Sequence, residues 1–130
     1  MTPLEEARKH FSWDHYASQT TGCQIDEVGE KYAKCSLTLD SRHRNMVGQV
    51  MGGVSFTLAD FTFGVAANYN QQLTVTINAS ISHLGPVKGN RLIAEAKLIK
   101  DGKRNCFYEV YITDELDTPV AHATITGAHL

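Results

Sequence analysis

The chain has 130 residues, a length that fits one domain and leaves little room for a second. Hydrophobic residues make up 42% and charged residues 20%, values that are typical of a globular protein and exclude a disordered one. The net charge of −2 gives no reason to expect nucleic acid or an anionic membrane as a partner.

The cysteines and the first residues indicate the compartment. Cys23, Cys35 and Cys106 form no CxxC pair, so we expect buried free thiols in a reducing environment. The N-terminal residues lack the pattern of a signal peptide, and no apolar run reaches the ~18 residues that cross a bilayer. We therefore predict a single cytoplasmic domain covering residues 1–130, with no membrane partner.

The first elements are a helix and two strands. Thr2, Pro3 and Glu5 give a capping residue, a first-turn proline and an acidic partner three positions after the cap, which predicts a helix start. Strands are predicted over residues 23–28 and 31–39, with a tight turn at positions 29 and 30 between them. The next residues are polar and then glycine-rich, which indicates a loop leading into a helix.

Residues 54–70 predict a buried helix. Val54, Leu58, Phe61 and Val65 repeat at helical spacing, and apolar residues fill most of the other faces. A helix that is apolar nearly all round is expected inside the core.

The second half of the chain is predicted to be sheet. Residues 73–84 alternate apolar and polar side chains, and further strands are predicted over residues 91–100, 105–113 and 120–128. One buried helix needs a sheet curved around it, so we predict an α+β hotdog fold: an antiparallel sheet of five to six strands wrapped around one long central helix. Residues 73–84 are the candidate for an unpaired edge strand, which a dimer could pair.

Asp60 lies inside the apolar helix, where burying an ionised carboxylate is costly unless it is paired. It belongs either to a thin exposed stripe with Thr57, Gly64 and Asn68, or to a half-buried site. In the second case it could act as a base or a nucleophile.

Gly52 and Gly53 stand where that helix begins. Free backbone N–H groups at a helix start could stabilise an oxyanion, although a glycine-rich helix start is also common. Asn45, in the preceding loop, could hold a water or a carbonyl oxygen, or could only shape a turn.

Helix geometry separates these groups. Gly52 and Asp60 lie about 12 Å apart along a straight helix, so one small reacting group cannot contact both within one chain. If both act on one carbonyl, Gly52 and Asn45 come from one subunit and Asp60 from the other. The catalytic interpretation therefore predicts a dimer with its site at the interface.

The six histidines show no metal-ligand spacing, so we predict no metal. No GxSxG elbow and no phosphate-binding glycine loop is present.

Residues 43–68 resemble the PaaI-type acyl-CoA thioesterases of the hotdog superfamily. The family pattern is roughly N-x-x-G-x-x-H-G-G, followed by L-x-D in the helix. The matching positions are Asn45, Gly48, Gly52, Gly53, Leu58 and Asp60.

The resemblance implies hydrolysis of an acyl-CoA thioester to a free acid and coenzyme A, with no cofactor beyond the coenzyme A of the substrate. It implies that Asp60 is the base or nucleophile, that the Gly52 N–H polarises the carbonyl and that Asn45 orients the carbonyl or the water. Thr76 would help to place the water or the acid. The implied assembly is a homodimer or a dimer of dimers, with Asp60 and Thr76 donated across the interface.

Gly53, Met51 and Phe61 are expected to contact the substrate. Met51 departs from the family pattern, which has a histidine there that is thought to support the loop; methionine cannot donate or accept comparably. A hotdog protein that binds acyl-CoA or a lipid without turnover is therefore the alternative. A hotdog hydratase or dehydratase is the third hypothesis. Hydratases of this fold carry an Asp and a His five positions apart at the central helix, and here that spacing occurs only at Asp117 and His122, outside it. Dehydratases prefer a His at the start of the helix and a Glu within it, where this chain has Met51 and Asp60.

Overall fold

The structure is a computed structural model that describes all 130 residues. It contains two α-helices, a π-helical turn, a short 3-10 helix and six strands. In chain order these are α1 (Pro3–Phe11), η1 (Tyr16–Thr21), β1 (Gln24–Gly29), β2 (Tyr32–Thr38), η2 (Ser41–His43), α2 (Gly52–Asn68), β3 (Thr74–His83), β4 (Arg91–Asp101), β5 (Asn105–Asp114) and β6 (Pro119–His129). No helix is long and apolar enough to cross a membrane.

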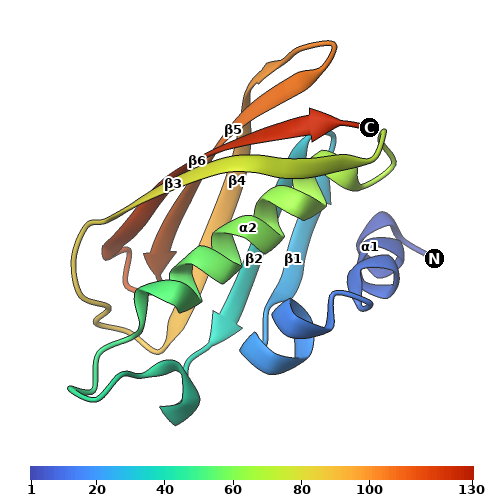
Figure 1. The fold of residues 1–130 in the computed structure, drawn as a ribbon. Coiled ribbons are helices and arrows are strands. Elements are labelled where there is room, and N and C mark those ends of the chain that lie inside the picture. Colours follow the sequence, from blue (N-terminus) through green and yellow to red (C-terminus); the bar gives the residue numbers. More distant parts are fainter.

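All six strands form one antiparallel sheet in the order β1-β2-β4-β5-β6-β3. The sheet curves around α2, which lies on its concave face, while α1 and η1 lie beside β1 (Figure 1). This is the predicted hotdog arrangement, so the α+β fold class and the single long central helix are confirmed. The three cysteines are free and buried, as expected.

The two helices begin where short sequence signals place them. The Glu5 N–H donates to the Thr2 hydroxyl and the Thr2 N–H donates to the Glu5 carboxylate, both at 3.2 Å, so the predicted capping box is present. The central helix begins at Gly52, two residues before the predicted start, because glycine adopts the helical backbone there once the loop ends at Met51.

The turn between β1 and β2 differs from the prediction by one residue. Gly29 ends β1 in extended backbone, and the turn consists of Glu30 and Lys31, with Lys31 at a φ of 53°. The Lys31 ammonium forms an ion pair with Asp101 at 2.7 Å.

β3 is an edge strand, as predicted, but its apolar residues do not share one face. A β-bulge between Thr76 and Asn78 in the pairing with β6 inserts one residue and changes the alternation of side chains. Val75, before the bulge, and Ile77, the inserted residue, are 40% and 58% exposed. Of the alternating apolar residues in this strand, only Ala79 and Ile81 pack against the core.

The bulge lets both halves of β3 face α2. Thr76, before the bulge, bonds to Asp60 on the helix. Beyond it, Ala79 and Ile81 pack against the core, and His83 reaches the first residue of α2. An unbulged strand would direct Thr76 and His83, seven residues apart, to opposite faces.

Candidate active site

Asp60 and Thr76 are brought together by α2 and β3. The Thr76 hydroxyl donates to Asp60 Oδ1 at 2.9 Å. Asp60 is exposed in the single chain and lies on the stripe of α2 that the sheet leaves uncovered, with Thr57, Gly64 and Asn68. Of the two positions considered from the sequence, one chain shows the exposed stripe. This stripe lies along the β3 edge of the sheet, to which Asp60 and Asn68 bond.

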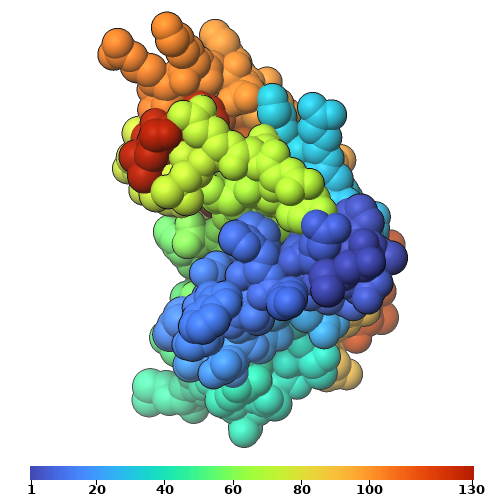
Figure 2. Space-filling view, turned by 90° about the vertical axis from the view of Figure 1, so that its right-hand side faces the viewer, coloured from blue at the N-terminus to red at the C-terminus, as the bar shows by residue number.

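A cavity of about 470 Å³ opens beside the Asp60–Thr76 pair. The N-terminal segment forms one wall of this cavity, and α2 and β3 form the others. The lining residues are Asp14, His15, Tyr16, Ala17, Phe56, Thr57, Asp60, Phe61, Phe63, Gly64, Thr74 and Thr76. The blue N-terminal segment crosses this side of the molecule next to the light green end of α2 (Figure 2). Phe61, predicted to contact substrate, lines the cavity, whereas the wall from the N-terminal segment had no signal in the sequence.

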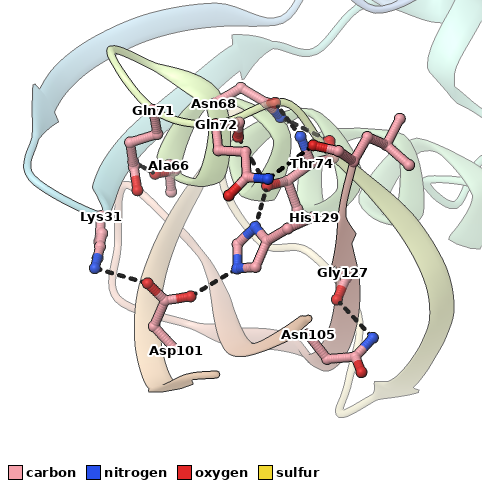
Figure 3. A network of polar contacts seen from close by, with 11 residues as sticks. Lys31, Ala66, Asn68, Gln71, Gln72, Thr74, Asp101, Asn105, Gly127 and His129 are labelled. Atoms are coloured by element: carbon pink, nitrogen blue, oxygen red, sulfur yellow. Dashed lines mark hydrogen bonds and ion pairs between the residues drawn. The ribbon is translucent and has the colours of Figure 1, made fainter. Parts of the chain in front are cut away.

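Thr74, at one end of the cavity, is held by a polar network (Figure 3). His129 Nδ1 lies 2.8 Å from the Thr74 hydroxyl, and His129 Nε2 lies 2.8 Å from Asp101 Oδ1. Asp101 also accepts from Lys31 Nζ at 2.7 Å. Lys31 and His129 hold the pKa of the Asp101 carboxyl below its usual range. The network therefore fixes Thr74 through side chains from three other strands or turns.

The same network includes a group that histidine spacing did not predict. Ligand atoms of Asp101, His129 and the buried Cys106 lie within 4.8 Å of one another. The Asp101 carboxylate is already paired with the Lys31 ammonium. We therefore interpret this group as a hydrogen-bonded network that positions Thr74 rather than as a metal site.

The start of α2 carries the candidate oxyanion donors. Gly52 and Gly53 are exposed, and their N–H groups have no acceptor in the chain, because they occupy the first turn and Met51 provides no side-chain cap. A Cβ on Gly52 would come within 2.8 Å of His83 Nε2, so a side chain there would displace this ring. His83, which the sequence did not single out, thus borders the predicted donor.

Asn45 shapes the loop before α2. Its side-chain oxygen accepts the N–H groups of Val47 and Gln49, each at 3.1 Å. The oxygen is therefore used by the turn, and only the amide nitrogen of this exposed side chain is left to contact a substrate.

His43 holds the same loop from inside the protein. The ring is 2% exposed; its Nδ1 accepts the Asp40 N–H at 3.0 Å, which leaves Nε2 to donate to the Thr21 carbonyl at 2.7 Å. The His43 carbonyl accepts the Met51 N–H at 2.9 Å. In the family pattern, a histidine at the position of Met51 is thought to support this loop. In this chain His43, at a different position, forms hydrogen bonds that hold the same loop.

The predicted residues form two groups in one chain. Asp60, Thr76 and Phe61 gather at the cavity, while Met51, Gly52 and Gly53 gather at the start of α2 with Asn45 in the loop beside them. The eight positions from Gly52 to Asp60 still correspond to about 12 Å of helix. One chain does not bring the two groups to a single atom.

A family model described as the thioesterase superfamily matches residues 47–121, more than half of the chain. The chain belongs to the thioesterase superfamily. This thioesterase-superfamily chain is 31% identical over 101 residues (77% of the chain, 66% of the relative) to a protein of Archaeoglobus fulgidus named as a candidate esterase. It is 28% identical over 105 residues (80% of the chain, 75% of the relative) to the acyl-coenzyme A thioesterase PaaI of Escherichia coli K12.

A solved structure has the same fold. A hypothetical thioesterase protein of Streptococcus pneumoniae TIGR4, solved with coenzyme A, superposes with a TM-score of 0.84 and 22% identity, over 92% of this chain and 96% of that one. The PaaI-type resemblance is confirmed. The matched region spans 60% to 75% of the length of the curated relatives.

Proposed function

We propose that this thioesterase-superfamily protein hydrolyses acyl-CoA thioesters to the free acid and coenzyme A. The observation that carries the proposal is the Asp60–Thr76 pair, which lies at a cavity between α2, β3 and the N-terminal segment. The names of the relatives support it, since one is an acyl-coenzyme A thioesterase and one structure contains coenzyme A.

Asp60 supplies the base or the nucleophile. As a base, its carboxylate takes a proton from a water whose oxygen attacks the thioester carbonyl carbon; the C–S bond then breaks, and the thiolate of coenzyme A recovers the proton. As a nucleophile, the carboxylate attacks the same carbon, and the C–S bond breaks to release the thiolate of coenzyme A and leave an anhydride. Water then cleaves the anhydride to the free acid and the Asp60 carboxylate, and the proton released from that water goes to the thiolate. The Thr76 hydroxyl occupies Oδ1 in both cases, so Oδ2 faces the reaction.

The start of α2 supplies the electrophilic side. The free Gly52 N–H donates to the carbonyl oxygen and stabilises the negative charge that forms on it. The amide nitrogen of Asn45 orients the carbonyl or the water. Gly53 and Met51 border the thioester, and Phe61 contacts the acyl group.

The two halves of the site come from two subunits of a homodimer. β3 leaves one edge of the sheet unpaired, and a second copy can pair with it. A twofold pairing of β3 with β3 also sets the two α2 helices antiparallel, so the Gly52 end of one helix lies beside the middle of the other. The strand half with Thr76 then lies beside the half that carries the partner subunit's His83. Two such dimers could associate further.

Binding of acyl-CoA without turnover is the second candidate. It is favoured by Met51, which is 52% exposed and makes no cap hydrogen bond where the family pattern has histidine. His43 supplies support for the loop, which is why we place hydrolysis first.

Release of the free thiol from a panel of aliphatic and aromatic acyl-CoAs tests the proposal, with Asp60→Ala and Asp60→Asn beside the wild type. We expect both variants to lose at least about a hundredfold in kcat/KM. Asp117→Asn, in the exposed β5–β6 turn, is the matched control and should retain full activity. Binding of acyl-CoA with no turnover by the wild type would establish the second candidate instead.

A further inference from the structure

We propose that Gly64 determines which acyl groups this enzyme takes, by leaving open the end of the cavity into which the acyl chain extends beyond the thioester. This inference rests on the proposed hydrolysis. It starts from a glycine that neither the backbone nor the packing of the molecule requires.

Gly64 lies in the C-terminal half of α2, one turn before the helix ends at Asn68, and has ordinary helical backbone, since only Gly22 and Gly48 have a positive φ among the glycines. Glycine is the poorest helix former after proline, so a glycine in the interior of a helix destabilises it relative to alanine. A Cβ built on Gly64 meets no atom within 4 Å. The structure therefore has room for a side chain that the sequence omits.

Gly127 shows the contrasting case. A Cβ there would come within 2.7 Å of Thr74 Cγ2 and 2.8 Å of Phe63 Cζ, so close packing demands glycine at that position. No such neighbour explains Gly64, which borders the cavity beside Asp60.

The open space at Gly64 is not caused by a separation of α2 from β3. The helix is tied to the strand on both sides of it: Asp60 accepts from the Thr76 hydroxyl at 2.9 Å, and Asn68 exchanges two hydrogen bonds with the Thr74 backbone at 2.8 and 3.0 Å. Thr74 is in turn held by His129, as Figure 3 shows. The open space at Gly64 is therefore a part of the cavity that these hydrogen bonds between α2 and β3 enclose on two sides.

The position of this space defines its use. Gly64 lies one helical turn beyond Asp60, about 6 Å along the axis. With the thioester carbonyl at Asp60, an acetyl or propanoyl group ends before it reaches Gly64, whereas a hexanoyl or octanoyl group lies against it. Apolar side chains, Phe61 and Phe63, line the same cavity. The substrate class is therefore acyl-CoA whose acyl group extends at least one helical turn beyond its carbonyl.

The test is a graded series, Gly64→Ala and Gly64→Leu, assayed on acetyl-, butanoyl-, hexanoyl- and octanoyl-CoA. We expect Gly64→Leu to lower kcat/KM on hexanoyl- and octanoyl-CoA by at least about tenfold and on acetyl-CoA by less than about threefold. Gly64→Ala is the matched control for the helix: it should raise the Tm by roughly 4 °C and affect only the longest group.

Two further measurements separate the outcomes. Binding of non-hydrolysable thioether analogues of the same four acyl-CoAs, by calorimetry, should show the same loss for long groups only, and this readout does not depend on turnover. Wild-type binding without turnover would contradict the proposed function but leave this inference standing. An equal loss on all four groups, no loss on the long ones, or a shift of Gly64→Leu to monomers in sedimentation would overturn the inference. The last result would assign the space to a side chain of a second copy.

Discussion

At the scale of single residues, Asp114 joins the β5–β6 turn to the loop between β3 and β4. The carboxylate is buried, and its two oxygens accept four backbone N–H groups at 2.9 to 3.0 Å, from Lys88, Gly89, Leu116 and Thr118. Burial alone would raise the pKa of this carboxyl, but these donors outweigh it and hold the pKa far below its usual range.

Asp114→Asn should therefore destabilise the fold by about 3 kcal/mol at pH 7, because an amide nitrogen cannot accept from two of the four donors. The carboxylate contributes above its unfolded-state pKa of about 4, and this contribution is lost as the pH falls toward the lower folded-state pKa. The difference between variant and wild type should thus shrink below about pH 4. Urea unfolding at pH 7 and pH 3 measures both quantities.

Asp117→Asn is the control for this comparison. Asp117 is exposed in the same turn with a φ of 62°, which asparagine adopts equally well, so its stability should not change at either pH. A difference between Asp114→Asn and wild type that stays constant from pH 7 to pH 3 would contradict the assignment.

Residue roles could be predicted from the sequence only where a local pattern carries them. The spacing from Asn45 through Gly52 to Asp60 identified the candidate site, and the resemblance to PaaI-type thioesterases pointed to Thr76, which bonds to Asp60. His83 was missed because its place beside Gly52 depends on a contact 31 positions away in the chain. Local sequence patterns carry no information on such contacts.

At the scale of elements, the bulge in β3 shows a second limit of the sequence. The alternation in residues 73–84 correctly predicted a strand, and this strand lies at an edge of the sheet, as predicted. The apolar and polar residues still alternate through the bulge, so the sequence pattern gives no sign of it. The bulge is visible only in the pairing with β6, which shifts by one residue between Thr76 and Asn78. Which side chains face α2 is therefore fixed by the pairing, which the strand's own sequence does not encode.

His43 connects three elements: its ring bonds to Thr21 at the end of η1 and to Asp40 before η2, and its carbonyl bonds to Met51 at the start of α2. His43→Leu retains an apolar volume and the backbone bond to Met51, but leaves the Asp40 N–H and the Thr21 carbonyl without the ring as partner. We therefore expect a loss of about 2 to 3 kcal/mol. Because the Gly52 donor moves with this loop, kcat should fall more than KM changes.

Chemical denaturation and thiol-release kinetics measure these two effects of His43→Leu. His10→Leu, on the exposed face of α1, is the matched control and should alter neither. A His43→Leu protein with wild-type stability would show that the loop is held by other contacts.

At the scale of the whole molecule, the fold could be predicted from the apolar composition of the central helix more than from any motif. Nine of the 17 residues of α2 are buried, and a single such helix can be covered only by a curved sheet. The second subunit stays a prediction: the exposed Asp60 stripe and the unpaired edge of β3 are the surfaces to which the proposed partner would bind.

Ala79→Pro tests that partner directly. The Leu84 N–H donates to Val120 on β6, so by antiparallel alternation the Ala79 N–H points away from β6, toward the free edge. Proline removes this donor while the bonds to β6 remain. We expect the wild type to sediment as a dimer or a dimer of dimers, and Ala79→Pro as a folded monomer that releases no thiol, since Gly52 and Asp60 no longer meet. Ala79→Ser, which keeps the N–H, should stay assembled and active. A dilute wild-type monomer with full activity would instead mean that one chain completes the site, and would contradict the proposal that two subunits share it.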